Sequence, residues 1–149
     1  MNTLSISKFR SGLFAAVLAV APWAPALQGQ DVGMIANVNV PFAFETSSGH
    51  HFAPGLYSIK MENVHTLLIR GTSDVALTPA TAEDNAQPAK TGKATFRRYG
   101  NQYFLTGITV QGASRSLHFD KSKSELRMQI AAGKTTPTNV EVALSGTAH

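Results

Sequence analysis

The chain contains no cysteine, and only 15% of its 149 residues are charged. Without cysteine, no disulfide can restrict the unfolded chain, so we expect the fold to rest on its own hydrophobic core. The same absence excludes thiolate metal sites, and it excludes the bacterial lipoprotein route, in which a lipidated cysteine follows the signal sequence. Stability must therefore come from packing, hydrogen bonds and a small number of charged groups.

Long hydrophobic runs are also missing, and the one short run lies near the N-terminus. Lys8 and Arg10 precede the apolar residues 13–21, and the small-residue site Ala24-Pro25-Ala26 follows them. This order is typical of a secretory signal peptide, and the run is shorter than the roughly 20 residues that a membrane span needs. The alternative is an uncleaved anchor or a buried helix. We expect cleavage after Ala26, with Gly29 as second choice, and export to the periplasm or the extracellular space.

The chain also has little net positive charge. The formal net charge is +4, and it falls to +2 when Lys8 and Arg10 leave with the signal peptide. Such a mild charge does not indicate a nucleic-acid partner. The remaining residues 27–149, about 120 in all, are enough for one domain that buries roughly two thirds of its unfolded surface.

What the sequence does contain is a regular alternation of apolar and polar residues. Residues 35–61 predict a β-hairpin, because each arm alternates with a period of two, the period of a strand. Pro54-Gly55 is a turn pair at the start of the second arm. The alternating apolar residues are Val38, Val40, Phe42 and Phe44 in the first arm, and Tyr57, Ile59 and Met61 in the second.

Further short strands follow along the chain. We expect strands at 65–70 and at 75–78, the second stopped by Pro79. Residues 80–93 have few large apolar groups and predict the most mobile loop. A final strand is expected at 140–144, before a flexible tail at about 145–149.

A second hairpin is predicted at 93–110. Gly100-Asn101 lies between its arms, and glycine in the first central position suits a type II′ turn. Gly107 interrupts the second arm, which is typical of a bulge or of a bend where a sheet curls.

Residues 121–132 fit either a helix or a strand. Ser122 and Glu125 have capping-box spacing, Leu126 and Ile130 lie four apart, and Gly133 is a plausible stop, whereas Leu126, Met128 and Ile130 also alternate as in a strand. We favour the helix because signals occur at both ends and because its residues are good helix formers. The fold class is therefore all-β, a small antiparallel barrel or a β-sandwich with one short helix near the C-terminal end.

The order of these features resembles a group of small uncharacterised secreted proteins of acidobacteria. The segment VNVPFAFETSSGHHFAPGLYSI is similar to their "IPFDF…LPAGxY" opening, and FRRYGNQYFL is similar to their "RYG…YFL" hairpin. Ala43 departs from the pattern, in which an acidic residue is common, and so do residues 51–53. The group has no established activity, so the resemblance implies a compartment and a fold and leaves the chemistry open.

Signature motifs of catalysis and metal binding are absent from the sequence. No serine lies in G-x-S-x-G, and residues 122–125 do not form S-x-x-K. His50 and His51 are adjacent, so they point to opposite faces of an extended backbone and cannot share a metal ion in the usual way. Carboxylates are few and scattered, although two can still meet in a cleft. We expect no metal, no cofactor and no catalytic residue.

Two features remain as a ligand or partner surface. One is the basic and aromatic mixture of Arg97, Arg98, Tyr99 and Tyr103, and the other is the loop 46–51 with His50 and His51. Alternation sends Arg97 and Arg98 to opposite faces, which divides the basic patch. The competing interpretation is a set of solvated charges that protect a strand edge.

The sequence thus favours an exported, non-catalytic β module that binds a ligand or partner through a barrel mouth or through the loops 46–51 and 80–93. The alternative is a structural subunit that assembles through β-edges or through its Thr-rich tail from Thr135. A small secreted hydrolase is the third possibility. The partner is expected to be an envelope component or a second copy of the chain, with no transmembrane segment left after cleavage.

Overall fold

The computed structural model describes residues 34–146, so the expected signal peptide and both cleavage sites lie outside the described residues. The strands are β1 Met34–Val40, β2 Phe44–Glu45, β3 His51–Phe52, β4 Gly55–Asn63, β5 Thr66–Arg70, β6 Val75–Pro79, β7 Thr81–Asp84, β8 Lys93–Tyr99, β9 Gln102–Thr109, β10 Arg115–His118 and β11 Thr138–Ser145. The one helix of this part of the chain is α1, Lys123–Ala132.

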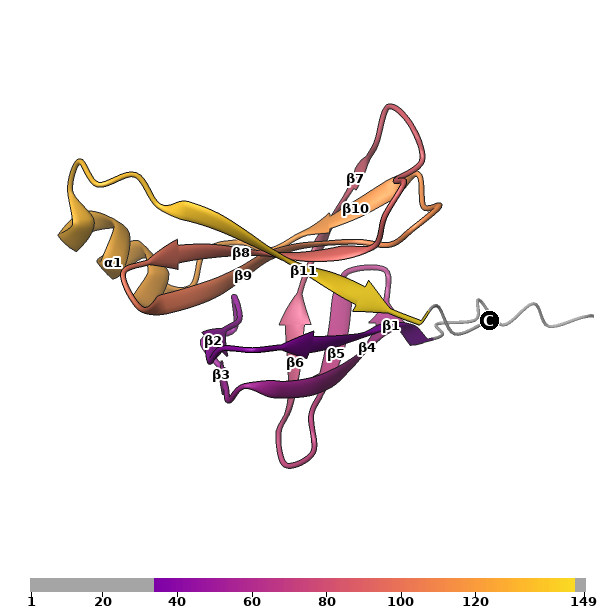
Figure 1. Ribbon diagram of the computed structural model, residues 1–149, viewed down its shortest axis with the longest axis horizontal. Helices are drawn as coiled ribbons and strands as arrows, with labels where there is room; N and C mark the ends of the chain where they lie inside the picture. Colours follow the sequence, from indigo (N-terminus) through magenta and orange to yellow (C-terminus); the bar gives the residue numbers. More distant parts are fainter. Residues whose placement is uncertain (1–33, 147–149) are drawn as a thin grey trace, which may run out of the picture.

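These strands form one curled, half-barrel sheet (Figure 1), which confirms the all-β prediction. The strand order is β3-β2-β9-β8-β11-β1-β4-β5-β6, and β10 pairs with both β7 and β9. All pairings are antiparallel except the single parallel bridge between β2 and β9. In the view of Figure 1, β8, β9 and β11 lie above β1, β4, β5 and β6, and α1 lies at one end beside β8 and β9. Within residues 34–146, no helix is long and apolar enough to cross a membrane.

The predicted loop 80–93 is partly a strand, so that prediction was wrong for its first residues. Thr81–Asp84 form β7, which pairs with β10, while β6 pairs with β5. Only Ala80 separates β6 from β7, so one extended segment links the two parts of the sheet. The side chains of β7 are all exposed, which explains why the sequence shows no apolar alternation there.

The first hairpin forms as predicted, with one difference. β1 pairs antiparallel with β4, and Val38 faces Tyr57. However, β1 ends at Val40, and Phe44 belongs to β2. The strands β2 and β3, of two residues each, pair with each other and form a separate small hairpin. This small hairpin leaves the β1–β4 pair and joins β9, because Phe44 and Phe52 both enter the core.

Aromatic rings fill the core at this end of the sheet. Phe44 stacks on Phe52 with 5.1 Å between ring centroids, and it makes edge contacts with Tyr57 and Phe96, each at 5.3 Å. Edge-to-face and offset pairs of this kind stabilise a core beyond the area they bury. The aromatic cluster therefore holds the β2–β3 hairpin against the body of the sheet.

The second hairpin carries the predicted turn and the predicted bulge. A type II′ turn requires positive φ at its first central residue, and Gly100 has φ of 59°. The second central residue, Asn101, does not have positive φ, which distinguishes this turn from type I′. Thr95 pairs with Gly107 and Phe96 with Leu105, so Thr106 is the extra residue of a bulge. A Cβ on Gly107 would lie 3.3 Å from the carbonyl oxygen of Leu117 on β10. Glycine thus lets β10 approach where the sheet bends.

The helix begins and ends where the capping signals predict. The Ser122 hydroxyl accepts from the Glu125 N–H at 3.0 Å, and the Gly133 N–H donates to Ile130 O. The apolar pair behind this prediction does not face the sheet, since Leu126 is exposed and Ile130 is 80% exposed. Glu125 is buried in their place, because β8 supplies a charged partner for it.

The C-terminal strand forms as predicted and occupies the interior of the sheet. β11 pairs with β8 along Thr138–Ala143 and with β1 at Leu144 and Ser145. The Thr-rich tail is therefore not free for strand addition from Thr138 onward. Ser145, expected in the flexible tail, belongs to β11, and residues 147–149 lie outside the described part of the chain.

Substitution of Gly71 tests the packing around Tyr57. An added Cβ would lie 2.6 Å from Cε1 of the buried Tyr57 ring, which Phe44 and Phe52 hold in place. We expect Gly71→Ala to lower the free energy of unfolding by about 1–3 kcal/mol, measured by urea denaturation. Gly55→Ala is the matched control, because its Cβ would meet the same ring at an ordinary 3.9 Å. Equal stability of the two variants would contradict the tight contact.

Tyr57 also predicts a loss of stability at high pH. Burial raises the pKa of its hydroxyl above the ordinary value, and the negative charge of Asp74 adds to this. The unfolded chain therefore ionises first, so the free energy of unfolding falls as pH rises from about 10 through the pKa of the folded state. Tyr57→Phe lacks the ionisable hydroxyl and should not lose this part of its stability. Relative to the difference at pH 7, the free energy of unfolding of the variant should therefore rise against that of the parent above about pH 10. Parallel stability curves would contradict it.

Candidate functional site

The β8–β9 turn separates two hollows of the surface. The larger is a groove of about 600 Å³ between this turn, α1 and the segment before β11. Its lining is mostly apolar or small, with Tyr99 from β8 and Met128 from α1. The full set is Arg98, Tyr99, Gly100, Asn101, Gln102, Met128, Ala131, Ala132, Thr135, Thr136, Pro137 and Thr138.

The smaller hollow is a pocket of about 150 Å³ on the other side of the same turn. It shares Asn101 and Gln102 with the groove, and its lining includes the polar residues Glu45 and His51 from the β2–β3 hairpin. The full lining is Ala43, Phe44, Glu45, His51, Asn101, Gln102, Tyr103 and Phe104. One turn of the chain therefore forms a wall of both hollows.

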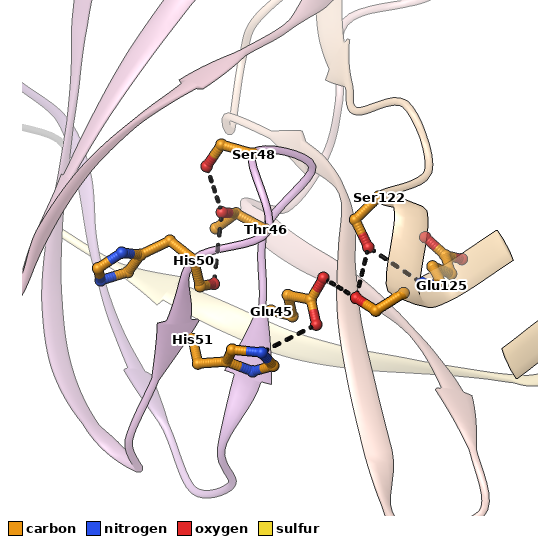
Figure 2. Close-up of polar contacts among 8 residues, drawn as sticks. Glu45, Thr46, Ser48, His50, His51, Ser122 and Glu125 are labelled. Atoms are coloured by element: carbon orange, nitrogen blue, oxygen red, sulfur yellow. Dashed lines mark hydrogen bonds and ion pairs between the residues drawn. The ribbon is translucent and has the colours of Figure 1, made fainter. Parts of the chain in front are cut away.

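A hydrogen-bonded network lies behind the pocket and links the β2–β3 hairpin to the start of α1 (Figure 2). Glu45 is only 3% exposed, and one of its oxygens accepts a short hydrogen bond from the Ser124 hydroxyl. Its other oxygen lies 3.3 Å from Nε2 of His51. Ser122 and Ser124 share a hydrogen bond of 3.1 Å. These contacts fix the helix against the hairpin.

Glu125 continues the network toward the sheet. Its carboxylate is 2% exposed, and Arg97 of β8 donates to it over 2.6 Å. Glu125 is in the first turn of α1, where the helix dipole also favours a negative charge. Because a buried carboxylate without a cation is costly, Arg97 allows α1 to pack with its charged side inward.

The order of groups along the network is not that of a serine-hydrolase triad. In such a triad the imidazole lies next to the hydroxyl and accepts its proton, and the carboxylate orients the imidazole. Here the Glu45 carboxylate lies between the Ser124 hydroxyl and His51. The Glu45 carboxylate positions Ser124 and His51 on either side of it. His51 is therefore not adjacent to the serine whose proton it would have to accept.

The basic and aromatic residues predicted from the sequence lie on two faces of the second hairpin. Arg97 points to the helix and pairs with Glu125, whereas Arg98 lies over the ring of Tyr103 at 5.5 Å from its centroid. Tyr99 lines the groove and Tyr103 lines the pocket. The structure thus divides the basic patch, as alternation indicated, and brings each tyrosine to a different hollow.

The two adjacent histidines point away from each other (Figure 2). His51 contacts Glu45, and its side chain is 78% exposed. His50 packs against Phe52 with 4.7 Å between ring centroids, and its buried Nε2 atom has no hydrogen-bond partner among the described residues. Within residues 34–146, no three His, Asp or Glu side chains come together in a group that could hold a metal ion.

Sequence reasoning missed four members of the network: Glu45, Ser122, Ser124 and Glu125. Only the capping spacing of Ser122 and Glu125 pointed to this region, and it indicated a helix start without indicating a buried carboxylate. Of the two loops predicted to bind, the loop 46–51 contributes His51 to the pocket. No residue of 80–93 lines the groove or the pocket.

Comparison with known proteins adds no relative. No protein-family model, no curated protein and no solved structure matches this chain. The resemblance to the acidobacterial group therefore stays a prediction.

Proposed function

We propose that the chain is an exported, non-catalytic β module that binds a ligand or partner at the β8–β9 turn. The observation that carries this proposal is the groove of about 600 Å³ beside the turn. Ligand sites are commonly concave and mostly apolar with a few polar groups, at roughly 300–1,000 Å³. Tyr99, Met128 and Pro137 supply apolar surface, and Asn101 and Gln102 supply polar groups at the rim.

Two further observations support the non-catalytic and exported parts of the proposal. The network around Glu45 places the carboxylate, and not the imidazole, next to the serine hydroxyl. The N-terminal residues have the basic segment, the short apolar run and the small-residue site of a signal peptide. The partner is then a component of the envelope or of the extracellular medium.

Native mass spectrometry of the mature chain, Leu27 to His149, purified gently from its own envelope fraction, tests the proposal. We expect a monomer or closed dimer with a reproducible extra mass, since a ligand held in the groove should survive gentle purification. A chain without any added mass, under conditions that preserve other envelope complexes, would count against a binding module.

A matched pair of variants locates the bound mass. Ala131 lines the groove, whereas its neighbour Ile130 is exposed and does not line it. Ala131→Trp should fill the groove and remove the added mass, while Ile130→Trp should retain it. Loss of the added mass in both variants, or in neither, would place the ligand elsewhere.

A structural subunit that assembles through β-edges is the second candidate, and β6 favours it. This strand ends the sheet order, and Val75 and Leu77 on it are 53% and 55% exposed. Exposed apolar edge strands are templates for pairing with another chain. Under this alternative, mass spectrometry shows an open ladder of oligomers without added mass, and Leu77→Lys abolishes the ladder.

A further inference from the structure

The Glu45 carboxylate lacks a permanent positive charge beside it within residues 34–146. It is buried, and its one ion contact is with His51, which is charged only when protonated and whose side chain is 78% exposed. Glu125, equally buried, has the permanent charge of Arg97 at 2.6 Å. Burying a carboxylate is costly unless a cation or several hydrogen bonds compensate it. Of the two, Glu45 is the one without a permanent cation, and only the Ser124 hydroxyl and the exposed His51 compensate its charge.

The pocket next to Glu45 has the lining that an organic cation needs. Besides Glu45, it is lined by Asn101 and Gln102, whose amide oxygens are acceptors, and by the aromatic residues Phe44, Tyr103 and Phe104. No lysine or arginine lines it. Its volume of about 150 Å³ equals that of roughly five waters, enough for an ammonium or guanidinium head group.

We propose that this pocket binds an organic cation, a primary ammonium or guanidinium group, whose charge is neutralised by Glu45. Ser124 donates to one carboxylate oxygen, and the other lies 3.3 Å from Nε2 of His51, whose exposed side chain the ligand would replace as its partner. A metal ion suits the pocket less well, because the described residues do not bring three His, Asp or Glu ligands together there. The proposal rests on the proposed function, since Asn101 and Gln102 belong to both hollows, and it specifies the chemistry of one end of the ligand.

Titration of the mature protein with butylammonium chloride, followed by ¹H–¹⁵N NMR, tests the proposal. We expect saturable shifts at the amides of Glu45, His51, Asn101 and Gln102, and no saturation with butanol or butyrate. Butylguanidinium ranks the two head groups. Tighter binding of Nα-acetyl-lysine methylamide than of butylammonium indicates a lysine side chain of a protein partner, and the reverse order indicates a free amine. An equal response to butanol would overturn the proposal.

Variants separate charge recognition from structure. Glu45→Gln retains an acceptor for Ser124 but removes the charge, so affinity for butylammonium should fall by about tenfold or more. Glu83→Gln is the matched control, because Glu83 also lies 3.3 Å from a histidine, His118, but at an exposed site. His51→Lys places a permanent cation beside Glu45 and should abolish binding.

Unchanged affinity in Glu45→Gln or in His51→Lys would reject the cation site. If Glu45→Gln does not fold, the probe series and His51→Lys decide the question. Failure of the cation site can be distinguished from failure of the proposed binding function. A co-purified ligand without a basic group, lost only in Ala131→Trp, would overturn the cation assignment and leave the binding module standing.

Discussion

Replacing Arg97 with methionine should lower the free energy of unfolding by about 3 kcal/mol, because it leaves Glu125 as a buried carboxylate without a cation. This loss lies at the low end of the usual range for a broken buried ion pair, since Arg97 itself is 28% exposed. Urea denaturation of the mature chain measures the loss. The helix should also fray first, because this ion pair joins α1 to β8.

Arg98→Met is the matched control for this prediction. Arg98 is the next residue on the same strand, but its side chain is exposed, lies over the ring of Tyr103 and donates to Gly100 O. Its loss should cost about 0.5–1 kcal/mol. The double variant Arg97→Met/Glu125→Leu should recover most of the stability, because it removes both charges from the interface. A double variant as unstable as Arg97→Met would show that the loss comes from packing.

Replacing Phe44 with alanine should lower the free energy of unfolding by about 3–5 kcal/mol, the usual cost of removing a buried phenylalanine side chain. Phe44 contacts three aromatic rings, those of Phe52, Tyr57 and Phe96, and no single neighbour can fill the cavity. Chemical denaturation measures the loss, and hydrogen exchange should show faster opening of residues 44–52.

This second prediction connects the core to the candidate site. Because Phe44 is adjacent to Glu45, loosening the β2–β3 hairpin should also weaken butylammonium binding. Leu56→Ala is the control, since Leu56 is exposed on β4 and its loss should change stability by no more than about 0.5 kcal/mol. If Phe44→Ala were no less stable than Leu56→Ala, the aromatic cluster would not be the anchor of the hairpin.

The site was only partly predictable from the sequence. Alternation correctly separated Arg97 from Arg98 and His50 from His51, since the side-chain period of a strand follows from local geometry. Neither alternation nor spacing indicated that Arg97 meets Glu125, 28 residues later, or that Ser124 meets Glu45, 79 residues earlier. Such contacts depend on how α1 docks on the sheet, and no local pattern contains that information.

By itself, the sequence determined the strands whose apolar residues alternate, the turn at Gly100, the bulge beside Gly107 and both ends of the helix. Each of these follows from local backbone preferences and from the period of two. Tertiary structure alone decided that β7 forms in a segment without apolar alternation and that the helix exposes Leu126 and Ile130. It also decided that two glutamates are buried. The physical reason is that burial and pairing depend on distant partners, such as β10 for β7 and Arg97 for Glu125.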